Sequence, residues 1–138
     1  MDWNKLGHIF LDNTFVEPKI VMELKRKCIW VTFEKEGIHC YPDAPDEVAF
    51  LRHPHRHMFH FRVEVEVFHD DRDLEFILLK RDLMLLYSDS VLTLDNKSCE
   101  MIATDLFKYI NEWYPGRNVS IEVSEDGENG ARLEWSNK

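Results

Sequence analysis

The chain has 138 residues, which suits a single domain with one hydrophobic core, and its 44% hydrophobic and 31% charged residues are typical of a globular protein. Its 26 acidic and 17 basic residues give a net charge of −9, and this field repels nucleic-acid phosphates and anionic membrane surfaces, so we expect neither as a partner. The three cysteines form no CxxC pair, and neither a secretion signal nor an apolar run near the ~20 residues of a membrane helix is present, which together predict a cytoplasmic protein.

Residues 1–27 are expected to form an N-terminal extension before a domain of residues 28–138. In the extension, GHIFLDNTF is compatible with a short strand or an extended arm, and KIVMELKRK with a helical turn that leads into a strand. The segment from Cys28 to Tyr41 is rich in β-branched and aromatic residues and stops at Pro42, which predicts a strand. The following PDAPDEVAFL, with its prolines and acids, is expected to be a loop.

Alternating apolar and polar residues from His57 to Phe68 predict a half-buried strand, and HDDRD after it predicts a turn. Asp73 is placed to cap a helix that continues as LEFILLKRDLMLLY. Three- and four-residue steps define one stripe of this helix, which is expected to face the sheet: Leu74, Ile77, Leu78, Arg81 and Leu85.

The next segment, SDSVLTLDNK, is expected to be a polar connection, after which Ser98 can cap a second helix that ends at Pro115 and Gly116. The apolar stripe of this helix is Ile102, Leu106, Ile110 and Trp113. NVSIEVSEDGENGARLEW predicts a hairpin, because apolar residues alternate on both sides of a Gly/Asn-rich turn. The order strand, strand, helix, helix, strand, strand predicts an α+β domain with an antiparallel four-stranded sheet and two helices on one face.

Four of the seven histidines fall within HPHRHMFHF, residues 53–61. In a strand, His55 and His57 project to the same side, so their rings can converge on one ion, whereas His60 faces the opposite side. His39 ends the preceding strand and lies at the same end of the sheet if the two strands form a hairpin. Three imidazoles with an open position suit a zinc site that binds a ligand; the alternative is a set of surface histidines at a polar loop end.

Four segments, in order along the chain, resemble one known family. HRHMFHFRVEV, residues 55–65, is similar to the HGHNYxVxV stretch of the 6-pyruvoyl-tetrahydropterin synthase and 6-carboxy-tetrahydropterin synthase family, whose members have the tunnelling fold, or T-fold. EFILLK (75–80), SCEMIA (98–103) and SIEVSEDG (120–127) are similar to the family's DFxxLK, TxENLA and VxVxET segments. The resemblance covers about residues 37–135 and implies a T-fold with the ββααββ order deduced above.

This resemblance implies that a zinc ion is held by His39, His55 and His57, with a water or the substrate in the fourth position. It also reveals departures from the family. Family enzymes have a base cysteine shortly before HxH, where this chain has DEVAFLRHP, and an Asp-His pair between the helices, where it has SDSVLTLDNK. The glycine of HGH is replaced by Arg56. The metal ligands of the family are therefore present, whereas its proton-transfer residues are missing.

The resemblance also implies ligand-binding residues. The Glu of VxVxE, here Glu125, binds the amino and N–H edge of a pterin or guanine-like ring, which suits a carboxylate because it accepts two parallel hydrogen bonds. The alternative for Glu125 is an acid in a solvated turn. Ser98 and Glu100 match the family's Thr and Glu and are further candidates, although a helix N-terminus explains both without a ligand.

Three functions stay open. The first is a zinc-dependent lyase that acts on dihydroneopterin triphosphate or a related pterin, with a base drawn from Cys40, His53 or His60. The second is a non-catalytic protein that captures a pterin, a guanine-like base or a nucleotide. The third is a subunit with a vestigial pocket that makes protein contacts. T-fold proteins associate edge to edge with pockets between subunits, so the resemblance also implies a homo-oligomer, a trimer or hexamer.

Overall fold

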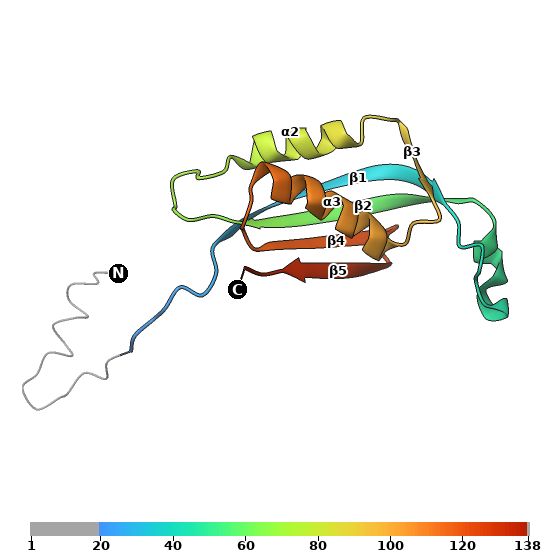
Figure 1. The fold of residues 1–138 in the computed structure, drawn as a ribbon, viewed down its shortest axis with the longest axis horizontal. Helices are drawn as coiled ribbons and strands as arrows, with labels where there is room; N and C mark the ends of the chain where they lie inside the picture. Colours follow the sequence, from blue (N-terminus) through green and yellow to red (C-terminus); the bar gives the residue numbers. More distant parts are fainter. Residues whose placement is uncertain (1–19, 138) are drawn as a thin grey trace, which may run out of the picture.

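The computed structural model describes residues 20–137, which form a five-stranded sheet with two α-helices on one face (Figure 1). In chain order the elements are β1 (Cys28–His39), the 3-10 helix η1 (Asp46–Arg52), β2 (His55–Glu66), α2 (Phe76–Leu86), β3 (Val91–Asp95), α3 (Cys99–Trp113), β4 (Val119–Glu125) and β5 (Asn129–Trp135). The strand order is β3-β1-β2-β4-β5, with β1 and β3 parallel and the other neighbours antiparallel. The α+β class is confirmed, but the sheet is five-stranded and mixed rather than four-stranded and antiparallel.

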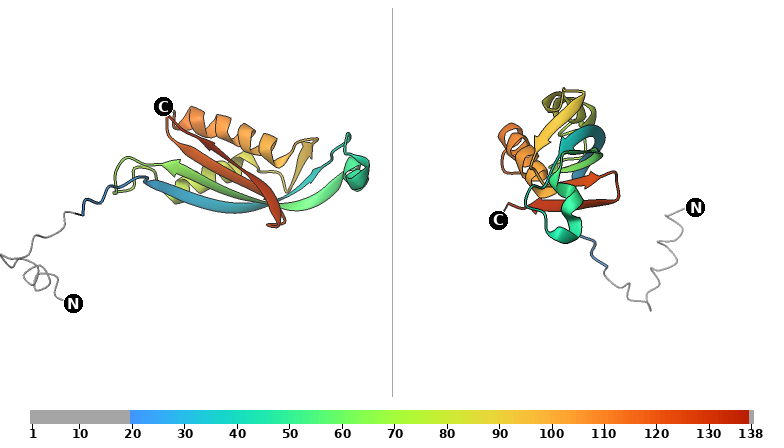
Figure 2. Two further views of the ribbon diagram at one scale, coloured as in Figure 1. Left: turned by 90° about the horizontal axis from the view of Figure 1, so that it is seen from below. Right: turned by 90° about the vertical axis from the view of Figure 1, so that its right-hand side faces the viewer.

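The longest pairing joins β1 and β2, which are 12 residues each. Their antiparallel register sets Cys28 opposite Glu66 and His39 opposite His55. Because side chains alternate along a strand, every second residue of β2 reaches the core: Phe59, Phe61, Val63 and Val65 are all buried. The connection that carries η1 extends beyond the end of the sheet, as Figure 2 shows. The predicted hairpin is therefore present, with His39 beside His55.

The second helix follows its prediction closely. Ser98 is the N-cap of α3, and its hydroxyl accepts a hydrogen bond from the backbone N–H of Met101 at 3.2 Å. The predicted stripe packs on the sheet, with these residues fully or almost fully buried: Ile102, Leu106 and Ile110. Just before α3, the carbonyl of Asp95 accepts a hydrogen bond from the N–H of Cys40 at 2.8 Å. This bond ties the segment that leads into α3 to the residue after β1, next to the histidines.

The segment predicted as a polar connection contains a strand. Val91–Asp95 form β3, which pairs in parallel with the last residues of β1. Its alternate residues Leu92 and Leu94 are buried in the core. Gly37 of β1 permits this packing, because a Cβ there would lie 2.8 Å from Leu94 Cδ1 and 2.9 Å from the ring of Phe59. The prediction was wrong because the strand is short and is stabilised by a partner distant in sequence.

The start of the first helix also differs from its prediction. The N-cap of α2 is Glu75, whose carboxylate accepts a hydrogen bond from a backbone N–H of the first turn at 2.8 Å. Asp73 does not cap the helix. Its carboxylate instead accepts hydrogen bonds from the N–H of Phe68 at 2.9 Å and from Arg117 at 2.7 Å. Asp73 therefore ties the loop after β2 to the segment before β4.

The buried face of α2 is not the predicted stripe. Leu79 and Leu83 are fully buried, whereas three residues predicted to face the sheet are more than half exposed: Ile77, Leu78 and Leu85. FILLKRDLMLL carries apolar residues around most of the helix, so more than one stripe fits the helical period. Contacts with the sheet select the stripe that is buried.

The extension ahead of the domain has no regular structure in the part described. Residues 20–27 contain neither helix nor strand, so the helical turn predicted there is wrong. The strand or arm predicted for GHIFLDNTF lies outside the described residues. The first strand begins at Cys28, where the domain was expected to begin. Within residues 20–137, no helix is long and apolar enough to cross a membrane.

Candidate metal centre

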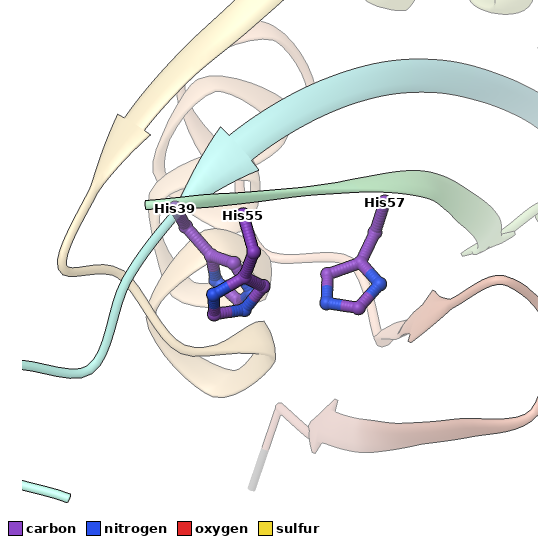
Figure 3. A group of neighbouring side chains, drawn as sticks. All are labelled: His39, His55 and His57. Carbon is purple, nitrogen blue, oxygen red and sulfur yellow. The ribbon is translucent and has the colours of Figure 1, made fainter. Parts of the chain in front are cut away.

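Three histidines converge at the end of the β1–β2 hairpin. His39 is in β1 and His55 and His57 are in β2, and their rings project to the same side of the two strands, as Figure 3 shows. One ring nitrogen of each residue lies within 4.8 Å of those of the other two. This spacing is close enough for the three residues to bind a metal ion. The pairing of His39 with His55 produces this convergence. Because side chains alternate along a strand, the three histidine side chains then lie on the face of the sheet that the helices cover.

Each of these rings is oriented by a hydrogen bond at Nδ1. The acceptors are the backbone oxygen of Lys97 for His39 (2.9 Å), the backbone oxygen of His53 for His55 (2.8 Å) and the Asp126 carboxylate for His57 (2.7 Å). An oxygen of a carbonyl or carboxylate can only accept, so each Nδ1 carries the proton. In a neutral ring this leaves Nε2 with a free lone pair, which is the arrangement of metal-binding histidines.

Two of the Nε2 atoms lack a hydrogen-bond partner among the described residues 20–137. They are those of His39 and His57, and both are buried. A buried polar atom without a partner costs about 1–3 kcal/mol. A cation that accepts both lone pairs removes this cost, and imidazole nitrogen suits zinc, copper, iron and nickel. The three residues therefore fit a transition-metal ion.

Asp126 is a site residue that sequence reasoning missed. It lies in the β4–β5 turn with φ of 56°, a conformation that Asp tolerates better than most residues. One carboxylate oxygen accepts the N–H of Met58 at 2.9 Å and the other accepts the ring N–H of His57. The bond from Met58, and then that from His57, lower the pKa of Asp126. The only signal for Asp126 in the sequence is that it directly follows Glu125. Its contact with His57 depends on strand pairing, which a local pattern does not reveal.

Replacing Asp126 with asparagine is expected to weaken zinc binding by about 10- to 100-fold, the usual cost of losing an outer partner of a ligand. Met58 and His57 donate to different oxygens of Asp126, and asparagine would set an NH2 group, which cannot accept, at one of these two positions. Affinity measured by competition with a chelator tests this. The control is Asp89→Asn, an exposed acid in the α2–β3 connection. Equal zinc affinity in the Asp126 and Asp89 variants would show that Asp126 does not support the metal site.

Glu125 ends β4 on the same face as the histidines. Its backbone pairs with Phe59 of β2 and Asn129 of β5. One carboxylate oxygen lies 3.3 Å from His39 Nε2, and the other lies 3.3 Å from His57 Nε2. The structure therefore sets Glu125 against the metal ligands, and the interpretation of it as a solvated turn acid does not account for this position.

A cleft of about 670 Å³ opens beside the three histidines. The predicted ligand-binding residues Ser98, Glu100 and Glu125 all line it, together with His39 and His55. The Ser98 hydroxyl is engaged as the N-cap of α3, whereas Glu100 is exposed. The cleft thus joins the end of β1, the start of α3 and the end of β4.

The three candidate bases occupy different places. Cys40 lines the cleft. His53 is exposed and contributes its carbonyl to the orientation of His55. His60 lies on the opposite face of β2, with Nδ1 3.4 Å from Glu34. Of the three, only Cys40 faces the cleft.

A second thiol, that of Cys99, also lines the cleft. Burial, followed by the charges of Glu125 and Glu100, raises its pKa to about 11. Cys99 therefore keeps its proton at neutral pH and does not supply a thiolate.

Comparison of the sequence with protein-family models and with curated proteins gives no match. The class of this protein therefore has to be inferred from its fold and from the geometry of the site.

Proposed function

We propose that this protein is a zinc-binding T-fold protein that binds a pterin- or purine-type ring. His39, His55 and His57 hold the metal and Glu125 anchors the ring. The observation that carries the proposal is the position of the Glu125 carboxylate, 3.3 Å from the rings of His39 and His57 and on the wall of one cleft with His39 and His55. Residues from β1, β2 and β4 thus meet in the combination that the family resemblance implies.

The topology supports a T-fold with one addition. The strands β1, β2, β4 and β5 pair consecutively and antiparallel, and α2 and α3 lie between the second and third of them in the chain. This is the ββααββ order of the family. The extra strand β3 lies between α2 and α3 in the chain and pairs with the outer edge of β1, so the complete order of strands and α-helices is ββαβαββ.

Zinc is the metal that we favour among those that accept imidazole. Three histidines with oriented Nδ1 atoms, beside a cleft, are typical of a zinc site that keeps a position for water or ligand. When bound, zinc would act as a Lewis acid on an oxygen of the ligand.

Charge around the cleft favours an uncharged ring over a triphosphate. Among the described residues that line it, the one Lys or Arg is Lys97, and its Nζ lies 2.5 Å from Asp105. Asp43, Glu100 and Glu125 contribute carboxylates. A polyphosphate would meet these without a free cation, whereas a ring edge of N–H groups would find acceptors. This observation favours the binding protein over the lyase.

Two assays separate these functions. Incubation of the zinc-loaded protein with dihydroneopterin triphosphate, followed by mass spectrometry, tests the lyase, and turnover would establish catalysis. Heat release and identification of small molecules that purify with the protein tests the binding protein. A pterin or guanine-type compound at stoichiometric amounts is the expected result. Absence of both turnover and any bound or titratable ring compound would leave a vestigial pocket.

Replacing Glu125 with glutamine is expected to weaken binding of guanine or neopterin by about 1.5–3 kcal/mol, the range for a hydrogen bond to a charged group. Titration of the metal-free protein isolates the effect on the ring, because no metal then competes for Glu125. Glu128→Gln is the matched control, since Glu128 is an exposed acid in the same hairpin. Unchanged affinity in the Glu125 variant would refute its role as ring anchor.

We also propose a homo-oligomer, a trimer or hexamer, in the cytoplasm. The backbone pairing of β3 covers residues 36–39 of β1, and β5 is the edge strand on the other side. Unprotected strand edges favour association with another strand. Sedimentation equilibrium should give three or six times the mass of one chain. A monomer would count against a pocket shared between subunits. Free thiols at Cys28, Cys40 and Cys99 are compatible with a reducing compartment.

A further inference from the structure

The carboxylate of Glu125 lies between two potential metal ligands rather than in open cleft. Each of its oxygens faces a different Nε2, that of His39 or that of His57, at the same distance of 3.3 Å. Neither contact is a hydrogen bond, since both Nε2 atoms lack a hydrogen-bond partner in the part of the chain that the structure describes. The side chain of Glu125 is 29% exposed, so it also borders solvent. It is therefore placed to reach both the histidines and a molecule in the cleft.

Proton positions make this arrangement unfavourable without a cation. Nδ1 of His39 and Nδ1 of His57 donate to oxygens, so the Nε2 atom of each neutral ring presents a lone pair. Two lone pairs then face two carboxylate oxygens that are themselves electron-rich. This contact is repulsive unless a positive charge lies between the groups.

Each separation, taken as a pair, is that of two neighbouring ligands of one ion. In a tetrahedral zinc site with bonds of about 2.0–2.2 Å to nitrogen and oxygen, neighbouring ligand atoms lie about 3.3–3.5 Å apart. The Glu125–His39 and Glu125–His57 separations each match this value, through a different carboxylate oxygen in each pair. The backbone of Glu125 is fixed at the end of β4 by its pairing with Phe59, so the side chain extends from a point that the sheet sets.

We propose that Glu125 is the fourth metal ligand when the cleft is empty, and that it leaves the metal when a ring compound binds. This inference rests on the proposed function. The Glu125 carboxylate then bonds either the metal or the N–H edge of the ring. When a ring binds, the carboxylate would vacate one coordination position of the metal. Metal and ring compete for Glu125, and their affinities are coupled reciprocally. A water or ligand atom gains access to the metal after the correct ring is in place.

Cobalt provides the test, because the visible spectrum of Co²⁺ depends on its ligands. The full chain is loaded with Co²⁺ as wild type, Glu125→Gln and the control Glu128→Gln. Loss of the fourth ligand is expected to weaken Co²⁺ binding at least tenfold in Glu125→Gln and to change its spectrum. Adding guanine or neopterin should shift the wild-type spectrum toward that of Glu125→Gln and leave the Glu125→Gln spectrum unchanged.

The outcomes separate this inference from the proposed function. If wild type and Glu125→Gln bind Co²⁺ with the same affinity and spectrum, Glu125 is not a ligand, and the three-histidine site stands without it. If Glu125→Gln differs, and an equilibrium titration shows that guanine or neopterin binds wild type without altering its spectrum, the exchange is refuted. If neither compound binds, the ring-binding function fails. If wild type binds neither Co²⁺ nor Zn²⁺, the proposed function itself fails.

Discussion

Replacing His57 with alanine is expected to abolish stoichiometric zinc binding. His57 contributes a buried Nε2 that has no hydrogen-bond partner within residues 20–137, and its ring is oriented by Asp126. Loss of a direct ligand should exceed the ~10–100-fold typical for an outer partner, so we expect zinc affinity to fall at least a hundredfold. Metal content after dialysis, together with chelator competition, measures the change.

The matched control is His60→Ala. His60 is three residues further along β2, on the opposite face, and its nearest charged contact is Glu34 at 3.4 Å. This variant should keep zinc. The wild type and His60→Ala should also gain about 2.7 kcal/mol of unfolding free energy at a free zinc concentration 100 times the wild-type dissociation constant, whereas His57→Ala, with at least hundredfold weaker affinity, should gain at most about 0.4 kcal/mol. Full zinc content in His57→Ala would mean that the assigned ligands are wrong.

Replacing Leu83 with alanine is expected to lower the free energy of unfolding by about 2–5 kcal/mol, the range for a buried leucine that leaves a cavity. Leu83 is fully buried in α2 and belongs to the core between helices and sheet. The matched variant is Leu85→Ala, two residues further along α2, where the side chain is 66% exposed. Its effect should stay within about 0.5 kcal/mol.

Urea unfolding of both metal-free variants measures this difference. The comparison is sharp because the helical period alone favoured Leu85 as the buried residue. If Leu85→Ala lowered the free energy of unfolding more than Leu83→Ala, the stripe predicted from the sequence would be the buried one. The helix α2 would then have to be rotated about its axis.

The local pattern was sufficient for the longest elements. Period-two alternation in β2 and the apolar stripe of α3 each point to one face, so they predict which residues are buried: Phe61 and Leu106 are examples. Ser98 could be recognised as a cap because the preference is local chemistry. Antiparallel pairing of consecutive strands then predicted that His39 would meet His55 and His57.

The features that the sequence did not predict depend on partners far away in the chain. Val91–Asp95 is too short to be recognised as a strand from its own residues. It forms a strand by pairing with the edge of β1. α2 has more than one apolar stripe, and packing against β1 decides that Leu83 is buried. Asp126 bonds His57 across 69 positions, a contact set by the register of β4 on β2.

The amino-acid sequence by itself therefore determined the α+β class, the hairpin and the choice of three histidines, because periodicity and turn chemistry act over a few residues. Tertiary structure alone decided the fifth strand, the buried face of α2, the support of His57 by Asp126 and the place of Glu125 against two rings. Strand register and helix packing are selected by the total burial of the whole chain, and no short segment contains that information.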